Sequence, residues 1–448
     1  MPSPKPPHHP PASASPGQRP DAALSAGPSE APSEAAAEPA PPGPSAPQGT
    51  GWLWATLLAL CLGFIISQAF RTVAAMMAAP LQQTLGLSAS QLGLFAATFH
   101  LAFGGLQIFM GVGIDLYGIR RTLLCAWPLT VAGALLSASA TGYASLLLGQ
   151  TLVGAGCAPA FLACTVFIAR QFPAARFAAL SGLIMGLGGL GLLLTGTPLA
   201  WLIELSSWRV GFGVLAAGSA LAWLAVWIWV REAPQTGPRP EDSVLQALRS
   251  MGPLLRLPHT AGILALAAVN YAAFITLRGL WLGPLLMDRH GFTLVQSGHV
   301  ALAVSVIGLL GPPLFGRLPV QGAQRRRWIL RFTLGLSALF AVCGLSPLAS
   351  LTVLASLVIG FLCGFIVLQY ADVRAAYAPE QTGRAMALYT MAMFLGIALM
   401  QWVTGWSATW AQAHGWEVYQ AVNLTVLLML LIGALLFRML PAPDAARH

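Results

Sequence analysis

The chain has 448 residues, of which 56% are hydrophobic and only 8% are charged, and its mean hydropathy is +0.72. Soluble globular proteins carry about 25% charged residues, so this composition excludes an ordinary soluble domain and indicates a protein built for lipid. The formal net charge of +9 does not indicate a nucleic-acid partner, because the arginines lie between hydrophobic segments and act as signals of membrane topology.

Residues 1–50 are rich in proline, alanine and serine. Such a composition cannot form a hydrophobic core, so a disordered cytoplasmic tail is predicted. The tail lacks the basic start and adjoining apolar stretch of a signal peptide. The first apolar segment, from Trp52, is therefore expected to stay in the protein as an uncleaved helix.

Twelve apolar segments follow, most of them about as long as the roughly 20 residues that a membrane-spanning helix requires. Open strands cannot cross hydrocarbon, and the sequence lacks the alternating polar and apolar residues of a membrane barrel. The prediction is an all-α membrane protein with 12 transmembrane helices. The predicted spans cover residues 52–79, 89–112, 122–140, 143–170, 178–203, 209–230, 259–286, 294–315, 328–346, 350–375, 383–407 and 417–438.

The positions of the arginines predict the orientation of these spans. Links after the odd-numbered spans carry little positive charge beyond Arg209 and Arg289, whereas links after the even-numbered spans are rich in arginine. Because positively charged links stay in the cytoplasm, both termini are predicted to be cytoplasmic, in a multi-pass protein of the inner cell membrane. The arginines of the even-numbered links include Arg120, Arg121, Arg170, Arg176, Arg231, Arg256, Arg317, Arg325, Arg326, Arg327, Arg374 and Arg384.

The longest polar stretch inside the chain, residues 232–257, is predicted to be a cytoplasmic linker. It divides the spans into two six-helix bundles, residues 51–231 and residues 258–438, with a short C-terminal tail at 439–448. Part of the linker has the pattern of a short amphipathic helix on the membrane surface.

The two halves repeat each other, which must be recognised before a fold is inferred. The repeat is visible as identical residues at one constant offset along the chain. Gln91, Gly93, Gly111 and Arg120-Arg121 recur as Gln296, Gly298, Gly316 and Arg325-Arg326.

A short motif joins spans 2 and 3, in which Gly111, Asp115, Gly118, Arg120 and Arg121 follow the spacing G-x3-D-x2-G-x-R-R. Glycine permits a tight reversal, and the arginines hold the link in the cytoplasm. The alternative interpretation of this motif is a generic basic turn without a specific role. The spacing, between two predicted membrane helices, resembles the loop between helices 2 and 3 of major facilitator superfamily transporters.

This resemblance extends over residues 51–438 and implies two parallel six-helix repeats, related by an axis along the membrane normal. It also implies that Asp115 lies against the amino end of span 11, near Thr382–Arg384, and helps to close the cytoplasmic side as a gate. In the second repeat Val320 stands where an aspartate equivalent to Asp115 would fall.

Two arginines are predicted inside the membrane, Arg71 in span 1 and Arg278 in span 7. Such a charge costs roughly 2.5–3.5 kcal/mol on insertion scales. Because spans 1 and 7 are equivalent in the two repeats, the two side chains are expected to face each other in a central cavity and clamp a carboxylate or phosphate. The alternatives are that each reaches the outer interface or pairs with an internal acid. The expected substrate-binding residues are Arg71, Arg278, Gln68, Tyr271 and Trp281.

Few acidic residues lie within the predicted spans, so the cavity is expected to be positive and to favour an anionic or zwitterionic solute. Asp372 in span 10 is a candidate to carry a coupling proton; the alternative is a structural ion pair with Arg374 or Arg278. His100 in span 2 is the other titratable candidate, although a lone histidine on an apolar helix is more often a hydrogen-bonded packing residue.

These features predict a secondary transporter of a small organic anion or zwitterion, which works as a monomer by alternating access, with proton coupling as an option. Two alternatives stay open: an exporter of drugs or metabolites, and a membrane sensor that keeps the transporter fold and moves nothing. The sequence contains no nucleophile elbow, phosphate-binding glycine loop or metal-ligand cluster, so no enzyme activity, cofactor or metal site is expected.

Overall fold

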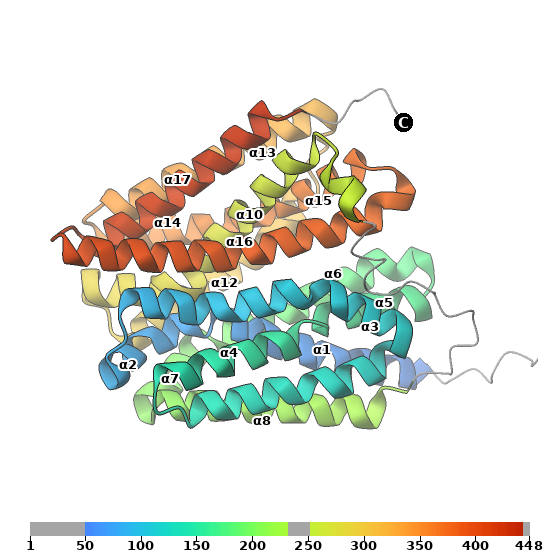
Figure 1. Ribbon diagram of the computed structural model, residues 1–448, viewed down its shortest axis with the longest axis horizontal. Helices are drawn as coiled ribbons and strands as arrows, with labels where there is room; N and C mark the ends of the chain where they lie inside the picture. The colour runs from blue at the N-terminus through green and yellow to red at the C-terminus, as the bar shows by residue number, and fades with distance from the viewer. Residues whose placement is uncertain (1–49, 232–250, 442–448) are drawn as a thin grey trace, which may run out of the picture. The chain divides into compact units, whose positions relative to one another are not determined.

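The computed structural model describes residues 50–231 and 251–441 (Figure 1). The predicted N-terminal tail, most of the predicted linker and most of the C-terminal tail, at 1–49, 232–250 and 442–448, lie outside the described residues. The described part consists of helices and short links, without strands. The prediction of an all-α protein is confirmed.

The helices of residues 50–231 correspond to the first six predicted spans. Spans 1, 4 and 5 each consist of two successive helices, and spans 2 and 3 share one long helix. The elements are α1 (Thr50–Thr72), α2 (Ala74–Leu85), α3 (Ala89–Ala138), α4 (Tyr143–Cys157), α5 (Ala160–Gln171), α6 (Ala174–Leu194), α7 (Thr197–Leu205) and α8 (Trp208–Trp229).

The helices of residues 251–441 correspond to the last six predicted spans. Spans 7 and 10 are built from several short pieces, among them two π-helical turns, η1 and η2, and the 3-10 turn η3. The elements are α10 (Thr260–Thr276), η1 (Leu277–Trp281), α11 (Leu282–Pro284), η2 (Leu285–Arg289), α12 (Leu294–Phe315), α13 (Gly322–Leu345), α14 (Ala349–Leu362), η3 (Cys363–Phe365), α15 (Ile366–Ala376), α16 (Pro379–Ala413) and α17 (Val418–Met439).

Eleven helical segments in the described part of the chain are long and apolar enough to cross a membrane. One of them, Ala89–Ala138, covers predicted span 2 and all but the last two residues of predicted span 3, so each of the twelve predicted spans corresponds to helix in the structure. This arrangement confirms a multi-pass integral membrane protein.

The internal repeat extends to the way in which equivalent helices begin. Ser88 caps α3, and its hydroxyl accepts a hydrogen bond from the Gln91 amide while the Gln91 side chain accepts one from Ser88. Thr293 and Gln296 form the same reciprocal pair at the start of α12. Such a capping box satisfies two backbone donors that a helix start leaves free.

The motif between spans 2 and 3 is more helical than predicted. The helix continues through Gly111 and Asp115, and the backbone leaves helical geometry only at Gly118, with φ 84° and ψ 167°. Glycine adopts this conformation without the clash that a Cβ would cause. Gly118 alone therefore makes the turn that was expected over residues 111–121, and Arg120 just beyond it donates to the Trp227 carbonyl at 3.1 Å.

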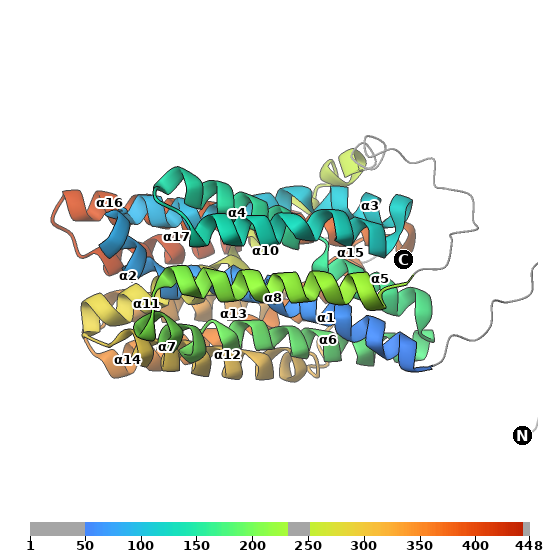
Figure 2. The same ribbon diagram turned by 90° about the horizontal axis from the view of Figure 1, so that it is seen from below.

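Helices from residues 50–231 and helices from residues 251–441 meet along a surface that we call the seam. α3 packs along α16 (Figure 1), and α6 and α7 pack against α12 (Figure 2). Glycine permits the closest approach, because a Cβ added at Gly93 of α3 would lie only 2.8 Å from the Cα of Gly405 in α16. Such small residues let membrane helices approach closely.

The seam is closed at one end of the helices, which we call the Tyr419 end. Here the Ser90 amide at the start of α3 donates to Thr409 Oγ1 in the last turns of α16 at 2.9 Å. The opposite end is called the Asp115 end. Each ion pair that the described residues form there joins two helices of the same half of the chain, so none of these pairs crosses the seam. The structure therefore has the seam joined at the Tyr419 end.

Candidate functional site around Arg71

Arg71 lies in the last turn of α1, just before the helix is interrupted at Val73. The residue is only 7% exposed. Its guanidinium carbon lies 4.7 Å from the ring centre of Phe103 in α3, 4.8 Å from that of Phe394 in α16 and 6.0 Å from that of Phe64 in α1. Aromatic rings from both sides of the seam thus surround the charge.

Among the described residues, the charge of Arg71 has no acidic partner. None of the ion pairs in the described part of the chain includes Arg71, and its Nε has no hydrogen-bond partner there. The guanidinium interacts with the Tyr271 hydroxyl of α10. Cation–π attraction is worth up to about 2 kcal/mol when the ring is desolvated, but rings and phenols carry no net negative charge. The paired donors of a guanidinium have the geometry to bind an anion with two oxygens.

Other polar groups lie near this charge. Gln68, one turn before Arg71 on α1, is buried, and its Oε1 has no partner among the described residues. Tyr370 of α15 contacts the Tyr389 ring with centroids 5.0 Å apart, and the Tyr389 hydroxyl donates to Gln369 Oε1 at 2.8 Å. Of the predicted substrate-binding residues, Tyr271 lies close enough to Arg71 to interact with it electrostatically, and Gln68 lies one turn before Arg71 on the same helix.

Arg278 does not share this site. It lies in η1, is 0% exposed and points toward α12 and α6. Its Nε donates to the Ala301 carbonyl at 3.0 Å and to Ser305 Oγ at 2.9 Å, and its Nη2 donates to the Leu192 carbonyl at 2.8 Å. The expectation that Arg71 and Arg278 face each other across one cavity is wrong for this state, because backbone carbonyls hold Arg278 elsewhere.

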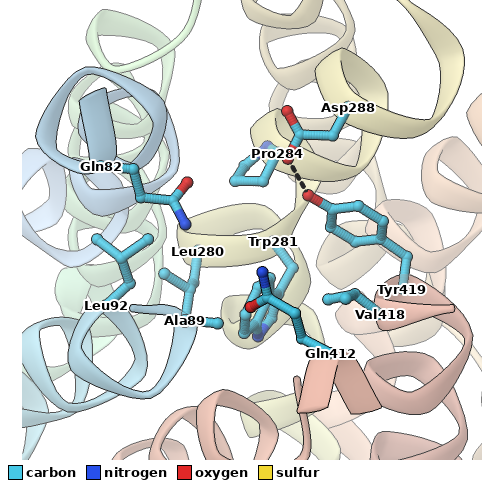
Figure 3. A pocket seen from close by; sticks show the side chains of 10 residues that line it. All are labelled: Gln82, Ala89, Leu92, Leu280, Trp281, Pro284, Asp288, Gln412, Val418 and Tyr419. Carbon is cyan, nitrogen blue, oxygen red and sulfur yellow. Dashed lines mark hydrogen bonds between the residues drawn. The ribbon is translucent and has the colours of Figure 1, made fainter. Parts of the chain in front are cut away.

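Trp281 is also separated from Arg71 and lines a cavity of about 220 Å³ at the Tyr419 end. Its Nε1 donates to Thr404 Oγ1 at 2.9 Å. Figure 3 shows the amides of Gln82 and Gln412 pointing toward the middle of this cavity, over an apolar floor. The cavity is lined by residues from both sides of the seam, so its volume depends on how the seam is closed. The lining residues are Gln82, Ala89, Leu92, Leu280, Trp281, Pro284, Asp288, Gln412, Val418 and Tyr419.

A polar network connects η2 to the start of α17 beside this cavity. The Tyr419 hydroxyl donates to Asp288, and Arg289 Nη1 lies 3.9 Å from the Glu417 carboxylate. Partial burial and the neighbouring Arg289 lower the pKa of His290, which follows η2. The imidazole is therefore neutral around pH 7, and it shares a hydrogen bond with a threonine of α14.

His100 is buried in the seam, one helical turn from Phe103. Its Nδ1 lies 3.2 Å from the Ala96 carbonyl and 3.0 Å from Gln401 Oε1 of α16. Both partners are acceptors, so Nδ1 carries the proton, and Nε2 has no partner among the described residues. His100 thus connects α3 to α16 as a hydrogen-bonded packing residue in this state.

Asp372 forms an ion pair, but with partners that the sequence did not suggest. Its carboxylate lies 3.3 Å from Arg325 Nη2 and 3.1 Å from Arg326 Nη1, and its side chain is 6% exposed. The expected partners, Arg374 and Arg278, are therefore wrong. The repeated arginine pair of the second half reaches Asp372 because α13 begins at Gly322, beside the end of α15.

We expect Asp372→Asn to destabilise the protein far more than Asp115→Asn. Removing the buried carboxylate leaves two arginines uncompensated, which costs about 3 kcal/mol or more, whereas the side chain of Asp115 is 62% exposed and its ion pair is worth about 1 kcal/mol or less. Thermal unfolding of the purified variants in detergent measures both effects. Equal losses would show that the Asp372 cluster is no stronger than a surface pair.

The motif of residues 111–121, which was predicted to form a gate, lies at the Asp115 end, within the helices of residues 50–231. Asp115 accepts a hydrogen bond from Arg170 Nη2 at 3.1 Å. Its expected neighbour, the amino end of span 11 at Thr382–Arg384, is not its partner in this state. With the seam joined at the Tyr419 end, the aspartate is held by its own half.

The phenylalanines around Arg71 were not predicted from the sequence. Phe64 had a usable signal, because it precedes Arg71 by seven residues, two helical turns on the same face. Phe103 and Phe394 come from segments far apart in the chain and meet Arg71 only through the packing of α3 on α16. No local pattern marks such a contact.

Comparison with known proteins identifies relatives in sequence. Residues 60–322 match the sequence model described as Major Facilitator Superfamily. A hexuronate transporter of Bacillus subtilis (strain 168) is 29% identical over 57% of this chain and 61% of its own length. A probable sulfoacetate transporter of Cupriavidus necator is 24% identical over 58% and 63%, and a lincomycin resistance protein of Streptomyces lincolnensis is 28% identical over 52% and 51%. The chain thus matches less than two thirds of the length of each relative.

Solved structures show the same fold at low identity. A bacterial homologue of the human lysosomal transporter Spinster, in an inward-facing and occupied conformation, has a TM-score of 0.69 at 18% identity, covering 87% of this chain and 97% of that one. A D-xylose–proton symporter has a TM-score of 0.68 at 17% identity, covering 88% and 99%. These likenesses confirm the predicted fold class.

Proposed function

The chain belongs to the major facilitator superfamily, and we propose that it is a secondary transporter that carries a small organic anion by alternating access. The observation that carries the proposal is the buried charge of Arg71, which has aromatic rings and a phenol around it and no acidic partner in the described part of the chain. The family and the fold are those of transporters and not of enzymes.

A buried arginine without a counterion is costly inside a membrane, and an intramembrane charge is retained when it serves a function. The planar guanidinium presents paired donors that match a carboxylate or sulfonate. Tyr271 and Gln68 add hydroxyl and amide groups for the rest of the solute, and the rings of Phe103 and Phe394 exclude water around it.

The names of the relatives support an anion and keep one alternative open. Hexuronate carries a carboxylate, and sulfoacetate carries a carboxylate and a sulfonate, so both fit an arginine site. The lincomycin resistance protein favours the second candidate, an exporter of drugs or metabolites. The effect of replacing Arg71 distinguishes the two candidates, because export of a lipophilic drug does not require this charge.

The remaining predicted features form part of the same proposal. The protein lies in the inner cell membrane with both termini in the cytoplasm, as two six-helix bundles joined by the linker, and works as a monomer. The Asp115 end is then the cytoplasmic end. There Gly111, Asp115, Gly118, Arg120 and Arg121 form a gate that closes when the Tyr419 end opens, and Asp115 then contacts the amino end of α16. His100 or Asp372 carries a coupling proton.

The test is ligand binding and flux with purified protein. We expect D-glucuronate and sulfoacetate to raise the thermal unfolding temperature, because a ligand that binds only the folded state stabilises it, and D-glucose to have no effect. Protein reconstituted in liposomes should take up the labelled anion that binds. An anion that binds without flux would support the sensor alternative, and stabilisation by lipophilic drugs alone would support the exporter.

A further inference from the structure

Arg278 is the most deeply buried charge in the described part of the chain, and the groups that satisfy it lie on both sides of the seam. Its Nε is held by Ala301 and Ser305 of α12, which belongs to the same half of the chain. Its Nη2 donates to the Leu192 carbonyl of α6, in the other half. One guanidinium thus connects the two halves within the membrane.

The acceptor in α6 is available because span 5 is interrupted. α6 ends at Leu194, and the last four carbonyls of a helix have no N–H partner within the helix. The Leu192 carbonyl accepts instead from Thr195 Oγ1 at 3.1 Å and from Arg278. A cation is favoured at this end, where the helix dipole is negative. The break between α6 and α7 therefore supplies a neutral substitute for a counterion.

One of the three nitrogens of this guanidinium has no hydrogen-bond contact among the described residues. Nη1 of Arg278 is buried and has no hydrogen-bond partner among the described residues. If α6 moves away from α12, Nη2 loses Leu192 and joins Nη1 as a second free donor, while α12 still holds Nε. These two terminal nitrogens form the planar fork that binds a carboxylate or sulfonate in a bidentate manner.

We propose that Arg278 exchanges partners during transport: it binds the carbonyl end of α6 while the seam is closed at the Tyr419 end, and it binds the transported anion when the seam opens there. This inference rests on the proposed function, since it assigns Arg278 to the same anion. In the state closed at the Tyr419 end, Arg71 alone supplies the positive charge of the solute site. In the state open at that end, Arg71 and Arg278 bind the anion together.

The consequence is that the anion favours opening at the Tyr419 end. A ligand shifts an equilibrium between two states only through a difference in affinity for them, and Arg278 provides that difference. The test uses a disulfide across the seam, between Ser90→Cys and Thr409→Cys, whose parent residues are joined by the 2.9 Å hydrogen bond. The pair is placed in the full chain without its six native cysteines and reconstituted in liposomes.

With this pair, D-glucuronate should slow disulfide formation several-fold, and D-glucose should not change it. Arg278→Gln should abolish the slowing, although D-glucuronate still raises the unfolding temperature through Arg71. Arg278→Lys keeps the charge and should keep a reduced response. Ser305→Ala is the matched control, because it removes a partner of Arg278 on its own side of the seam only, and it should keep the response.

An equal slowing in Arg278→Gln and in the parent protein, or no slowing in the parent, would overturn the partner exchange. If Arg278→Gln does not fold, the response of Arg278→Lys decides. An equal loss of the slowing in Arg278→Lys and in Ser305→Ala would mean that Arg278 has a packing role only. Failure of the proposed function appears separately, as the absence of any stabilisation by the anion in the parent protein.

Discussion

Replacing Arg71 by glutamine is expected to abolish anion transport while leaving the protein folded in the membrane. A charge-assisted hydrogen bond is worth about 1.5–3 kcal/mol, so loss of both donors of the fork corresponds to more than about 100-fold in affinity. Folding should survive, because Arg71 is held by aromatic rings and a phenol and not by an ion pair. Uptake of labelled anion into liposomes measures the effect.

The control for this result is an arginine with a similar ring contact outside the site. Arg209 stacks on Trp208 at 4.2 Å and donates to the Ala140 carbonyl, so Arg209→Gln removes the same charge without touching the solute. Arg71→Lys should retain part of the binding as a point charge without the fork. Transport by Arg71→Gln at the rate of the parent protein would exclude Arg71 as the anion ligand.

The second large effect is expected at the seam, where Gly93→Ala should prevent closure at the Tyr419 end. A Cβ at this position would lie 2.6 Å from the Gln401 carbonyl oxygen and 2.8 Å from the Gly405 Cα, and neither is a flexible side chain. Overpacking of this kind costs about 1–3 kcal/mol, which corresponds to a shift of about fivefold to a hundredfold toward the open seam. Turnover should fall in proportion, because transport requires both states.

Gly105→Ala is the matched control, since Gly105 lies on the same helix and a Cβ there meets nothing within 4 Å. Disulfide formation between Ser90→Cys and Thr409→Cys measures closure of the seam directly. It should slow when Gly93→Ala is added and stay unchanged when Gly105→Ala is added. If both glycine variants cross-link and transport alike, the contact of α3 with α16 does not limit the closed state.

Local pattern predicted most of the fold. Membrane-length apolar runs defined the twelve spans. The recurrence of Gln91 as Gln296 indicated an internal repeat, and the structure shows two equivalent helix starts at these positions, capped in the same way. The turn between spans 2 and 3 was predicted too wide, because the pattern could not show that Gly118 alone would make the break.

The site was harder to predict, because its partners are set by packing. The sequence identified Arg71 and Arg278 from the cost of burying their charge, but it assumed that equivalent helices place equivalent side chains face to face. Leu192 satisfies Arg278 through a backbone carbonyl, which no side-chain pattern reveals. The partner of Asp372 was missed for a related reason, since Arg325 reaches it from a distant segment.

The π-helical turns of span 7 have a mechanical consequence. A π turn closes its hydrogen bonds at i→i+5 and so holds one residue more than the α spacing. Because each residue of an α-helix advances the chain by about 100° around the axis, relaxation of η1 to α spacing would rotate the stretch from Leu282 to Arg289 by about that angle. Asp288 would then swing away from Tyr419 while α10 stayed in place. Span 7 thus contains a point at which such a rotation would change the wall of the cavity at the Tyr419 end without any tilt of the helix.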